Sequence, residues 1–168
     1  MSAISLRPYL PADASLCADI FRASVEVSAS DDYSDEQRDA WAARADDKAA
    51  FGARLAGALT LVALIDGEPV GFASLRGESE IDMLYVDPRF GRSGVGSALI
   101  DALTRLAGAR GAGQLTSDAS DTARPLFERH GFVAQRRNLV QIDDQWLANT
   151  TVTKRLAAPN ETRAPTRH

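Results

Sequence analysis

A glycine-rich loop between an apolar segment and a helical pattern constrains this chain more than any other feature. Residues 83–86, Met-Leu-Tyr-Val, are apolar, and the loop after them carries Gly91, Gly94 and Gly96 before the apolar positions of a helix. Glycine lacks the Cβ atom, so backbone N–H groups at the start of that helix can approach a ligand. This geometry suits an anion, most often a phosphate. The spacing therefore predicts a strand, an anion-binding loop and a helix, and the alternative is a glycine turn without a ligand.

Two familiar phosphate-binding loops do not match this one. A P-loop requires Gly-Lys followed by Ser or Thr, and no such run follows these glycines. A dinucleotide-binding loop follows the first strand of its domain and needs an acidic residue about 20 positions later. Neither pattern fits well, so the neighbouring segments must identify the ligand.

Length and charge restrict the class of protein. The 168 residues, of which 45% are apolar, suffice for one well-buried core and are few for two. The net charge of −4 disfavours broad electrostatic binding to nucleic acid or anionic lipid. Residues 1–7 lack the apolar core of a signal peptide, and no window has the apolar run of a membrane span. We therefore expect one cytoplasmic domain with no nucleic-acid or membrane partner.

The single cysteine lies within a helical pattern. Cys17 stands among Leu16, Ile20 and Phe21, which are apolar. This setting predicts a buried structural thiol in place of a nucleophile. A single cysteine also excludes an intramolecular disulfide and a thiol metal site, and we expect no metal.

Hydrophobic periodicity and turn signals give the order of elements. Asp13 is expected to cap the first helix, Ser34 to form a capping box with Gln37, and Asp66-Gly67 to form a hairpin turn. The predicted strands cover residues 4–7, 59–65, 70–76, 80–86, 114–117, 132–142 and 146–156. The predicted helices cover residues 13–28, 34–41, 46–55, 95–107 and 122–130. The segment 157–168 is rich in proline, threonine and charge, and we expect a flexible tail there.

In this order the chain resembles the GNAT superfamily, the acetyl-coenzyme A-dependent N-acetyltransferases. Residues 83–96 are similar to the family's strand, loop and helix with the motif Gln/Arg-x-x-Gly-x-Gly/Ala. Residues 123–132 are similar to its later signature Ala-x-x-Phe/Leu-Tyr-Glu-x-x-Gly-Phe. Residues 33–37, followed by Trp41-Ala42, resemble a small stand-alone bacterial branch of the superfamily.

The resemblance implies a fold and a cosubstrate. The fold is a single α/β (α+β) domain over residues 1–156, with a mixed, mostly antiparallel sheet of about six or seven strands flanked by helices and splayed at strand 80–86. Acetyl-CoA would bind with its pyrophosphate on the glycine loop and its pantetheine along the backbone near Leu84. The implied cofactor-binding residues are Leu84, Tyr85, Val86, Gly91, Arg92, Ser93, Gly94, Val95, Gly96, Ser97, Ser120 and Phe127. Arg89 and Arg92 either pair with phosphates or are solvated.

Three positions depart from the family pattern. Gly91 occupies the Gln/Arg position of the loop motif, so a side-chain contact is lost while the amides remain. Ser120 stands where many members have asparagine. Phe127 replaces the tyrosine that in many members protonates the departing thiolate, and a phenyl ring cannot donate a proton. That role then falls to Tyr85, to Ser117, to water or to no dedicated acid.

Two carboxylates are candidates for the general base. An amine with a pKa near ~10 arrives protonated, so a base or a water relay must remove its proton. Glu80 and Asp82 are expected to share one strand face with Leu84 and Val86. Glu80 also lies eleven residues before Gly91, the position of the catalytic glutamate in the histone-modifying branch that the chain resembles. The alternative is that both are solvated residues of an accessible sheet face.

The predicted function is transfer of an acetyl group from acetyl-CoA to a primary amine of a small molecule or peptide by direct attack. The alternative is an acyl-CoA-binding regulatory module without efficient turnover, and a nucleotide-binding signalling domain is a weaker third hypothesis. Tyr33 and Trp41 are expected to contact the acceptor, with a core role as the alternative for Trp41. His130 precedes a helix-ending glycine and is expected to cap carbonyls. The oligomeric state is open, with a homodimer as one option.

Overall fold

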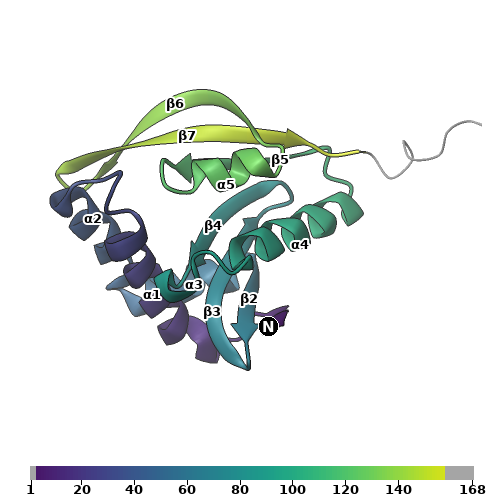
Figure 1. Cartoon of the computed structure of the whole chain (residues 1–168), viewed down its shortest axis with the longest axis horizontal. Coiled ribbons are helices and arrows are strands. Elements are labelled where there is room, and N and C mark those ends of the chain that lie inside the picture. The colour runs from purple at the N-terminus through teal and green to yellow at the C-terminus, as the bar shows by residue number, and fades with distance from the viewer. Residues whose placement is uncertain (1–2, 158–168) are drawn as a thin grey trace, which may run out of the picture.

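The computed structural model describes residues 3–157, so the predicted tail lies, from residue 158 on, outside the described residues. A seven-stranded sheet is flanked by helices (Figure 1). The strands are β1 (Ile4–Pro8), β2 (Leu59–Ile65), β3 (Glu68–Arg76), β4 (Glu80–Val86), β5 (Gln114–Ser120), β6 (Val133–Ile142) and β7 (Gln145–Arg155). The helices are η1 (Pro11–Asp13), α1 (Ala14–Ala23), η2 (Ser24–Ser28), α2 (Asp35–Ala42), η3 (Ala43–Ala45), α3 (Lys48–Ala56), η4 (Pro88–Phe90), α4 (Val95–Ala109) and α5 (Arg124–Arg129).

The sheet is mixed and mostly antiparallel, as predicted. Its strand order is β1-β2-β3-β4-β5-β7-β6, and the parallel neighbours are β4 and β5. These two strands share a single register pair, Glu80 with Thr116. Beyond that pair they diverge, which confirms the splay that the family resemblance implied at strand 80–86.

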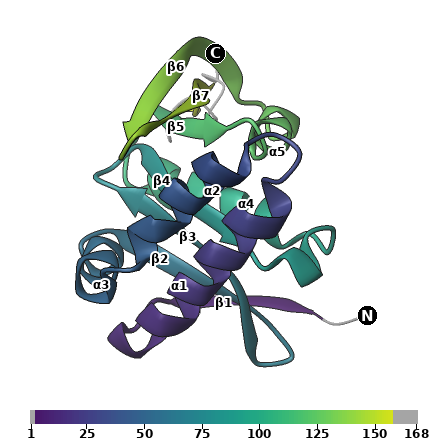
Figure 2. The ribbon, with the colours of Figure 1, turned by 90° about the vertical axis from the view of Figure 1, so that its left-hand side faces the viewer.

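The helices lie on opposite faces of the sheet. Helices α4 and α5 pack on one face, where Leu99, Leu103 and Phe127 join the larger buried cluster. Helices α1 and α3 cover the other face, where Phe21 and Leu55 join a second buried cluster, and Figure 2 shows α1 in front of the central strands. Apolar residues thus cover both sides of the central strands, as the nearly continuous apolar run of β2 predicts.

Most local signals give the predicted structures. Ser34 and Gln37 form the capping box, because the Ser34 hydroxyl accepts the Gln37 N–H at 3.1 Å and the Gln37 side chain accepts the Ser34 N–H at 2.8 Å. The hairpin turn after β2 has positive φ at Asp66 (52°) and Gly67 (78°), the backbone that an Asp-Gly turn adopts. The final hairpin likewise turns at Asp143, with φ of 54°.

Asp13 does not cap the first helix, which corrects the prediction. Its buried carboxylate accepts two hydrogen bonds from Arg7, at 2.7 and 2.8 Å, and the Leu10 N–H at 2.8 Å. The hydrogen bonds from Arg7 hold the pKa of Asp13 below its usual value. The carboxylate therefore ties β1 to the segment before α1, a contact that a capping pattern does not reveal.

The first helical segment and strand β5 also differ in extent. The predicted helix 13–28 is divided, since α1 ends at Ala23 and a π-helical turn follows over Ser24–Ser28. Strand β5 continues to Ser120, three residues beyond the predicted end, and helix α5 starts only at Arg124. This extension brings residues 118–120 onto the splayed edge.

Cys17 is buried, at 1% exposure, as predicted. Burial raises the pKa of its thiol to about 12, so the reactive thiolate is scarce at neutral pH. Among residues 3–157, every helix is too short or too polar to cross a membrane.

Candidate active site

A bulge in β4 sets the direction of its side chains. In the ladder with β3, Met83 lies opposite Ser74 and Ile81 lies opposite Leu75, which leaves Asp82 as the extra residue. A bulge re-aims the side chains that follow it. Across the splay, the Ser117 hydroxyl donates to the Ile81 carbonyl at 2.9 Å. The strand is therefore irregular on one edge and open on the other.

The bulge overturns the predicted shared face of β4. Leu84 and Val86 pack against the α4 side. Met83 and Tyr85 pack with the α1 and α3 side, and the Asp82 carboxylate pairs with Arg54 of α3. The prediction that Glu80 and Asp82 share a face with Leu84 and Val86 is wrong, because the extra residue inverts the alternation between them.

Two cavities meet on β4. One, here called the glycine-loop cavity, has a volume of about 670 Å³ and lies between the loop before α4, β4 and the start of α5. The other, here called the carboxylate cavity, has a volume of about 280 Å³ and holds Glu80, Asp82 and Asp118. Five residues line both, namely Trp41, Leu84, Tyr85, Ser120 and Ala123. A ligand in one cavity can therefore reach a ligand in the other beside Leu84 and Tyr85.

The glycine loop presents N–H groups without backbone acceptors. Ala98 donates the first bond of helix α4 to Gly94, so within the described chain the N–H groups of Val95, Gly96 and Ser97 keep no carbonyl partner. Gly94 adopts φ of 87°, which favours glycine. A Cβ on Gly96 would meet Leu126 Cδ2 at 2.6 Å, so this glycine also permits α4 and α5 to approach.

Two arginines add positive charge at the glycine-loop cavity. Arg92 and Arg129 line it and make no ion pair with any residue from 3 to 157. Arg89 lies elsewhere, since its guanidinium pairs with Asp87 at 2.8 Å and Glu68 at 3.1 Å. The unpaired arginines and the N-terminus of α4 together favour an anion.

His130 is the C-cap of α5, as predicted, because its backbone N–H donates to the Phe127 carbonyl at 3.0 Å, and its ring contacts α4. Its Nε2 lies 2.9 Å from the Ser97 hydroxyl, and its Nδ1 lies 3.3 Å from the Asp101 carboxylate. Ser97 lines the glycine-loop cavity. The histidine therefore positions a hydroxyl beside the anion-binding turn.

The structure brings together most of the predicted cofactor set. The members that line the glycine-loop cavity are Leu84, Tyr85, Val86, Gly91, Arg92, Gly94, Gly96, Ser97 and Ser120. Ser93 lies outside the lining and donates its hydroxyl to the Phe90 carbonyl at 2.6 Å. Val95 is buried beside Gly71, and Phe127 lines the carboxylate cavity instead. Ser93 and Val95 can thus contribute only their backbone groups to the loop.

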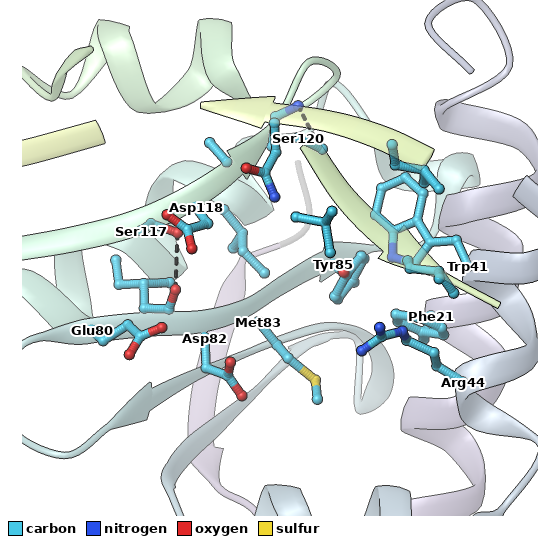
Figure 3. Close-up of a pocket in the computed structure, with 18 of the residues that line it drawn as sticks. Phe21, Trp41, Arg44, Glu80, Asp82, Met83, Tyr85, Ser117, Asp118 and Ser120 are labelled. Carbon is cyan, nitrogen blue, oxygen red and sulfur yellow. Dashed lines mark hydrogen bonds between the residues drawn. The ribbon is translucent and has the colours of Figure 1, made fainter. Parts of the chain in front are cut away.

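Both predicted base candidates are paired with arginines. Figure 3 shows the two carboxylates, Glu80 and Asp82, on the cavity wall. Asp82 pairs with Arg54 through two hydrogen bonds of 2.8 Å, and only 6% of its side chain is exposed. Glu80 pairs with Arg76 at 2.7 Å, and Arg76 also lies 3.5 Å from Asp82. Hydrogen bonding to Asp82 raises the pKa of Arg54. Accepting a proton at Asp82 would therefore disrupt a nearly buried ion pair.

Sequence reasoning missed four charged residues of the carboxylate cavity, namely Asp118, Arg44, Arg54 and Arg76. Asp118 accepts the Thr151 hydroxyl at 2.6 Å and has no cationic partner within residues 3–157. Thr116, Asp118 and Ser120 alternate along β5, and this pattern could have predicted that Asp118 lies on the same strand face. The predicted strand ended at residue 117, so the pattern was not recognised. No comparable signal marked Arg44, which lies in the one-turn helix η3.

Tyr85 stands where the two cavities meet. Its ring contacts Phe21, Phe72 and Trp41, with centroids 4.7, 5.7 and 6.3 Å away. Burial raises the pKa of Tyr85 to about 12. The phenol is therefore neutral at physiological pH and is able to donate a hydrogen bond.

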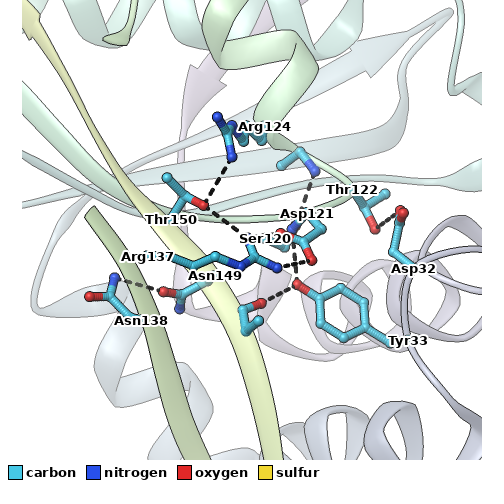
Figure 4. Close-up of polar contacts among 12 residues, drawn as sticks. Asp32, Tyr33, Ser120, Asp121, Thr122, Arg124, Arg137, Asn138, Asn149 and Thr150 are labelled. Atoms are coloured by element: carbon cyan, nitrogen blue, oxygen red, sulfur yellow. Dashed lines mark hydrogen bonds and ion pairs between the residues drawn. The ribbon is translucent and has the colours of Figure 1, made fainter. Parts of the chain in front are cut away.

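Tyr33 uses its hydroxyl for structure (Figure 4). The hydroxyl donates to the Ala148 carbonyl at 2.6 Å and accepts the Asp121 N–H at 2.9 Å. Its ring lies on the wall of the carboxylate cavity and packs on Trp41, with centroids 5.3 Å apart. The Ser120 hydroxyl similarly accepts the Ala123 N–H at 3.1 Å. Tyr33 thus fastens the segment before α2 to β7 and to the end of β5.

The fold and the matched family define the class of protein. The model of the acetyltransferase (GNAT) domain matches residues 29–146, which is more than half of the chain. The chain belongs to this family, the GNAT N-acetyltransferases.

Individual relatives cover nearly the whole chain. An uncharacterized N-acetyltransferase of Escherichia coli strain K12, YafP, is 42% identical over 150 residues, which is 89% of this chain and 94% of the relative. The crystal structure of a GCN5-related N-acetyltransferase from Rhodopseudomonas palustris is 59% identical, with a TM-score of 0.91, covering 93% of this chain and 98% of that one.

A more distant structure shares the fold alone. The PaiA N-acetyltransferase of Thermoplasma acidophilum, solved in complex with coenzyme A, is 17% identical with a TM-score of 0.76. It covers 92% of this chain and 99% of its own.

Proposed function

We propose that this protein transfers the acetyl group of acetyl-CoA to a primary amine of a small molecule or peptide by direct attack. The observation that carries the proposal is the junction of two cavities beside Leu84 and Tyr85. One cavity suits a phosphate-bearing cosubstrate, and the other holds carboxylates that suit an amine. Coenzyme A in the related Thermoplasma PaiA structure supports the choice of cosubstrate.

The glycine-loop cavity fits the phosphates and pantetheine of the cosubstrate. Free N–H groups of Val95, Gly96 and Ser97 would receive the pyrophosphate, assisted by Arg92 and Arg129. Residues 84–86 have no β5 partner in the register, so their backbone groups are available to an amide-containing arm. Acetyl-CoA would supply an acyl group activated as a thioester.

The residues at the junction then act on the reacting atoms. In the transfer, the amine nitrogen bonds to the thioester carbonyl carbon, the carbon–sulfur bond breaks, and the amine gives up a proton while the thiolate gains one. A backbone N–H on the open edge near Leu84 would stabilise the oxyanion. Such a preorganised donor stabilises the transition state by roughly 3–4 kcal/mol.

Glu80 and Asp118 are the proposed proton acceptors. Within residues 3–157, the partly exposed Glu80 pairs only with the exposed Arg76, and Asp118 has no cationic partner. Both line the carboxylate cavity from neighbouring strands. Asp82, held by Arg54 and nearly buried, instead positions β4 against α3. The sequence-based role of Asp82 as a base is therefore reassigned in this proposal.

Tyr85 is the proposed donor to the departing sulfur. Phe127 lies 2% exposed with its ring on Phe132 and has no proton to give. Tyr85 lines both cavities and keeps its proton at neutral pH. A thiolate departs readily, so a hydrogen bond from this phenol suffices where a strong acid is absent.

Phe127 also favours the second candidate, an acyl-CoA-binding module without efficient turnover. Calorimetric titration with acetyl-CoA, followed by a thiol-release assay with a panel of amines, separates the two functions. We expect saturable binding and amine-dependent thiol release. Binding without release from any amine would favour the regulatory module, and absence of coenzyme A binding would exclude both.

Three further expectations stay predictions. They are a single catalytic domain over residues 1–156, a cytoplasmic location, and a homodimer as one option for the assembly. Size-exclusion chromatography with light scattering would determine the last of these.

A further inference from the structure

The carboxylate cavity contains one arginine whose charge has no partner in the described chain. Its lining includes the cations Arg44, Arg54 and Arg76. Arg54 pairs with Asp82, and Arg76 pairs with Glu80. Arg44 makes neither a hydrogen bond nor an ion pair with any residue from 3 to 157.

Arg44 lies close to the reaction centre. Figure 3 shows its side chain extending from η3 toward the middle of the cavity, beside Phe21 and below Tyr85. Its positive charge acts on the Tyr85 phenol, which lines both cavities. A charge in this position can contact an acceptor whose amine lies at the junction.

The surroundings of Arg44 favour an organic acceptor with one negative charge. A guanidinium forms two parallel hydrogen bonds with a carboxylate. The glycine-loop cavity, which suits phosphates, combines Arg92 and Arg129 with the N-terminus of α4. The carboxylate cavity has only Arg44 free within the described residues, and the rings of Phe21 and Trp41 also line it. One guanidinium beside aromatic rings matches a monoanion with an apolar body better than a phosphate.

We propose that the acetyl acceptor is an amino acid or a similar small amine that carries a carboxylate, and that Arg44 binds this carboxylate. The inference rests on the proposed function. The acceptor's amine would lie toward Glu80 and Asp118, and its apolar body would contact Trp41 and Phe21. Arg44 therefore determines specificity, while the two carboxylates handle the proton.

Matched substrate pairs test this proposal. Alanine, leucine, phenylalanine and tryptophan are each compared with their carboxamides in the acetyl-CoA thiol-release assay. We expect kcat/KM to favour the carboxylate member of the best pair by about tenfold, a difference of about 1.4 kcal/mol. The amides have the less basic amines and are more readily deprotonated, so a preference for the carboxylate cannot arise from intrinsic reactivity.

Variants assign the preference to one side chain. In Arg44→Gln, the ratio of kcat/KM for the amino acid to kcat/KM for its carboxamide should fall close to one. In Arg44→Lys, this ratio should lie between the values for the wild type and for Arg44→Gln. Arg105→Gln, which changes an exposed arginine of α4 outside both cavities, should keep the wild-type ratio. A wild-type enzyme that prefers amides, or an Arg44→Gln variant that keeps the carboxylate preference, would overturn the proposal.

A binding measurement distinguishes this inference from the proposed function. N-acetylphenylalanine and its amide are titrated calorimetrically into the complex with coenzyme A, for the wild type and for Arg44→Gln. Tighter binding of the carboxylate that is lost in Arg44→Gln supports the site even if turnover fails. Turnover of amines without any carboxylate preference in either assay contradicts the inference and leaves the acetyltransferase proposal standing.

Discussion

The two cavities on β4 are built in opposite ways. The proposed anion site of the glycine-loop cavity consists of consecutive backbone N–H groups in the first turn of α4. The carboxylate cavity owes its character to side chains from distant elements, such as Arg54 of α3 and Asp118 of β5. The first therefore depends mainly on the backbone and on glycines such as Gly96, whereas the second depends on individual charged side chains. We expect this difference if the proposed cosubstrate binds in the first cavity and the proposed acceptor binds in the second.

The largest expected effect is on proton transfer in the carboxylate cavity. Asp118→Asn and Glu80→Gln remove proposed proton acceptors, and loss of a general base typically lowers the rate about 10²-fold or more. We expect the more important of the two to lower kcat by about 10²-fold, with the affinity for coenzyme A unchanged. Thiol-release kinetics and calorimetry measure the two quantities separately.

Asp82→Asn provides the contrast to these variants. It breaks the hydrogen-bonded pair with Arg54, so its main effect should be on stability, a loss of about 1–3 kcal/mol in the free energy of unfolding. If Asp118→Asn and Glu80→Gln each keep the wild-type kcat, neither carboxylate is the base.

The second prediction concerns Gly96 in the loop. A methyl group there would meet Leu126 Cδ2 at 2.6 Å, and Leu126 lines the same cavity. Gly96→Ala should therefore raise the dissociation constant for coenzyme A about tenfold, or about 1.4 kcal/mol. Calorimetry measures this constant, and a thermal melt verifies that the variant is folded.

Gly91→Ala is the matched control in the same loop. Gly91 has φ of −62°, and a Cβ there would lie 3.5 Å from the nearest neighbour, the Pro88 carbonyl oxygen. The affinity of the Gly91→Ala protein for coenzyme A should therefore differ from that of the wild type by less than about twofold. A folded Gly96→Ala protein with wild-type affinity would contradict the importance of this close approach.

The third prediction tests the role of Tyr33 in holding the wall of the carboxylate cavity. Tyr33→Phe leaves the Ala148 carbonyl and the Asp121 N–H without their partner, so the free energy of unfolding should fall by about 2 kcal/mol. Urea unfolding measures this change. Tyr9→Phe is the control, because the Tyr9 hydroxyl makes no hydrogen bond within residues 3–157. Equal losses of unfolding free energy in the two variants would contradict the structural role of the Tyr33 hydroxyl.

The smallest effect concerns pH and the Tyr85 phenol. Burial raises its pKa to about 12, against about 10 in an unfolded chain. Between pH 10 and 12 the unfolded chain gives up this proton while the folded protein keeps it, so stability is complete below pH 10 and declines above it. Tyr85→Phe should show a shallower decline between pH 10 and 11, by up to about 1.4 kcal/mol per pH unit. Urea unfolding measures the free energy of unfolding of both proteins at each pH. If it falls equally steeply in the wild type and in Tyr85→Phe, the assigned burial of the phenol is contradicted.

The sequence predicts the glycine-loop cavity better than the carboxylate cavity, because the residues of the loop are neighbours in the sequence. The glycine loop is continuous in sequence, so the spacing of Gly91, Gly94 and Gly96 correctly predicted a loop between β4 and α4, and the family resemblance implied the splay of β4. Periodicity also predicted most strands and the capping box at Ser34, because these depend on neighbouring residues.

The carboxylate cavity escaped prediction for the same physical reason. One extra residue at Asp82 inverts the side-chain alternation along β4. No residue pattern near Asp82 predicts this bulge. Arg54 reaches Asp82 from 28 residues away, and Tyr33 reaches Ala148 from 115 residues away. Such pairs depend on the placement of distant elements, so a single sequence cannot pair Asp82 with Arg54. The pair of Glu80 with Arg76, in contrast, lies across the short turn between β3 and β4.

Amide chemical shifts during a coenzyme A titration test the division between the cavities most directly. A nitrogen-15-labelled sample is titrated with coenzyme A and followed by heteronuclear NMR. We predict the largest changes at the N–H groups of residues 94–97 and 84–86, with small changes at Arg44 and Asp118. Changes concentrated at Arg44 and Asp118, with residues 94–97 unaffected, would contradict the assignment of the glycine loop to the cosubstrate.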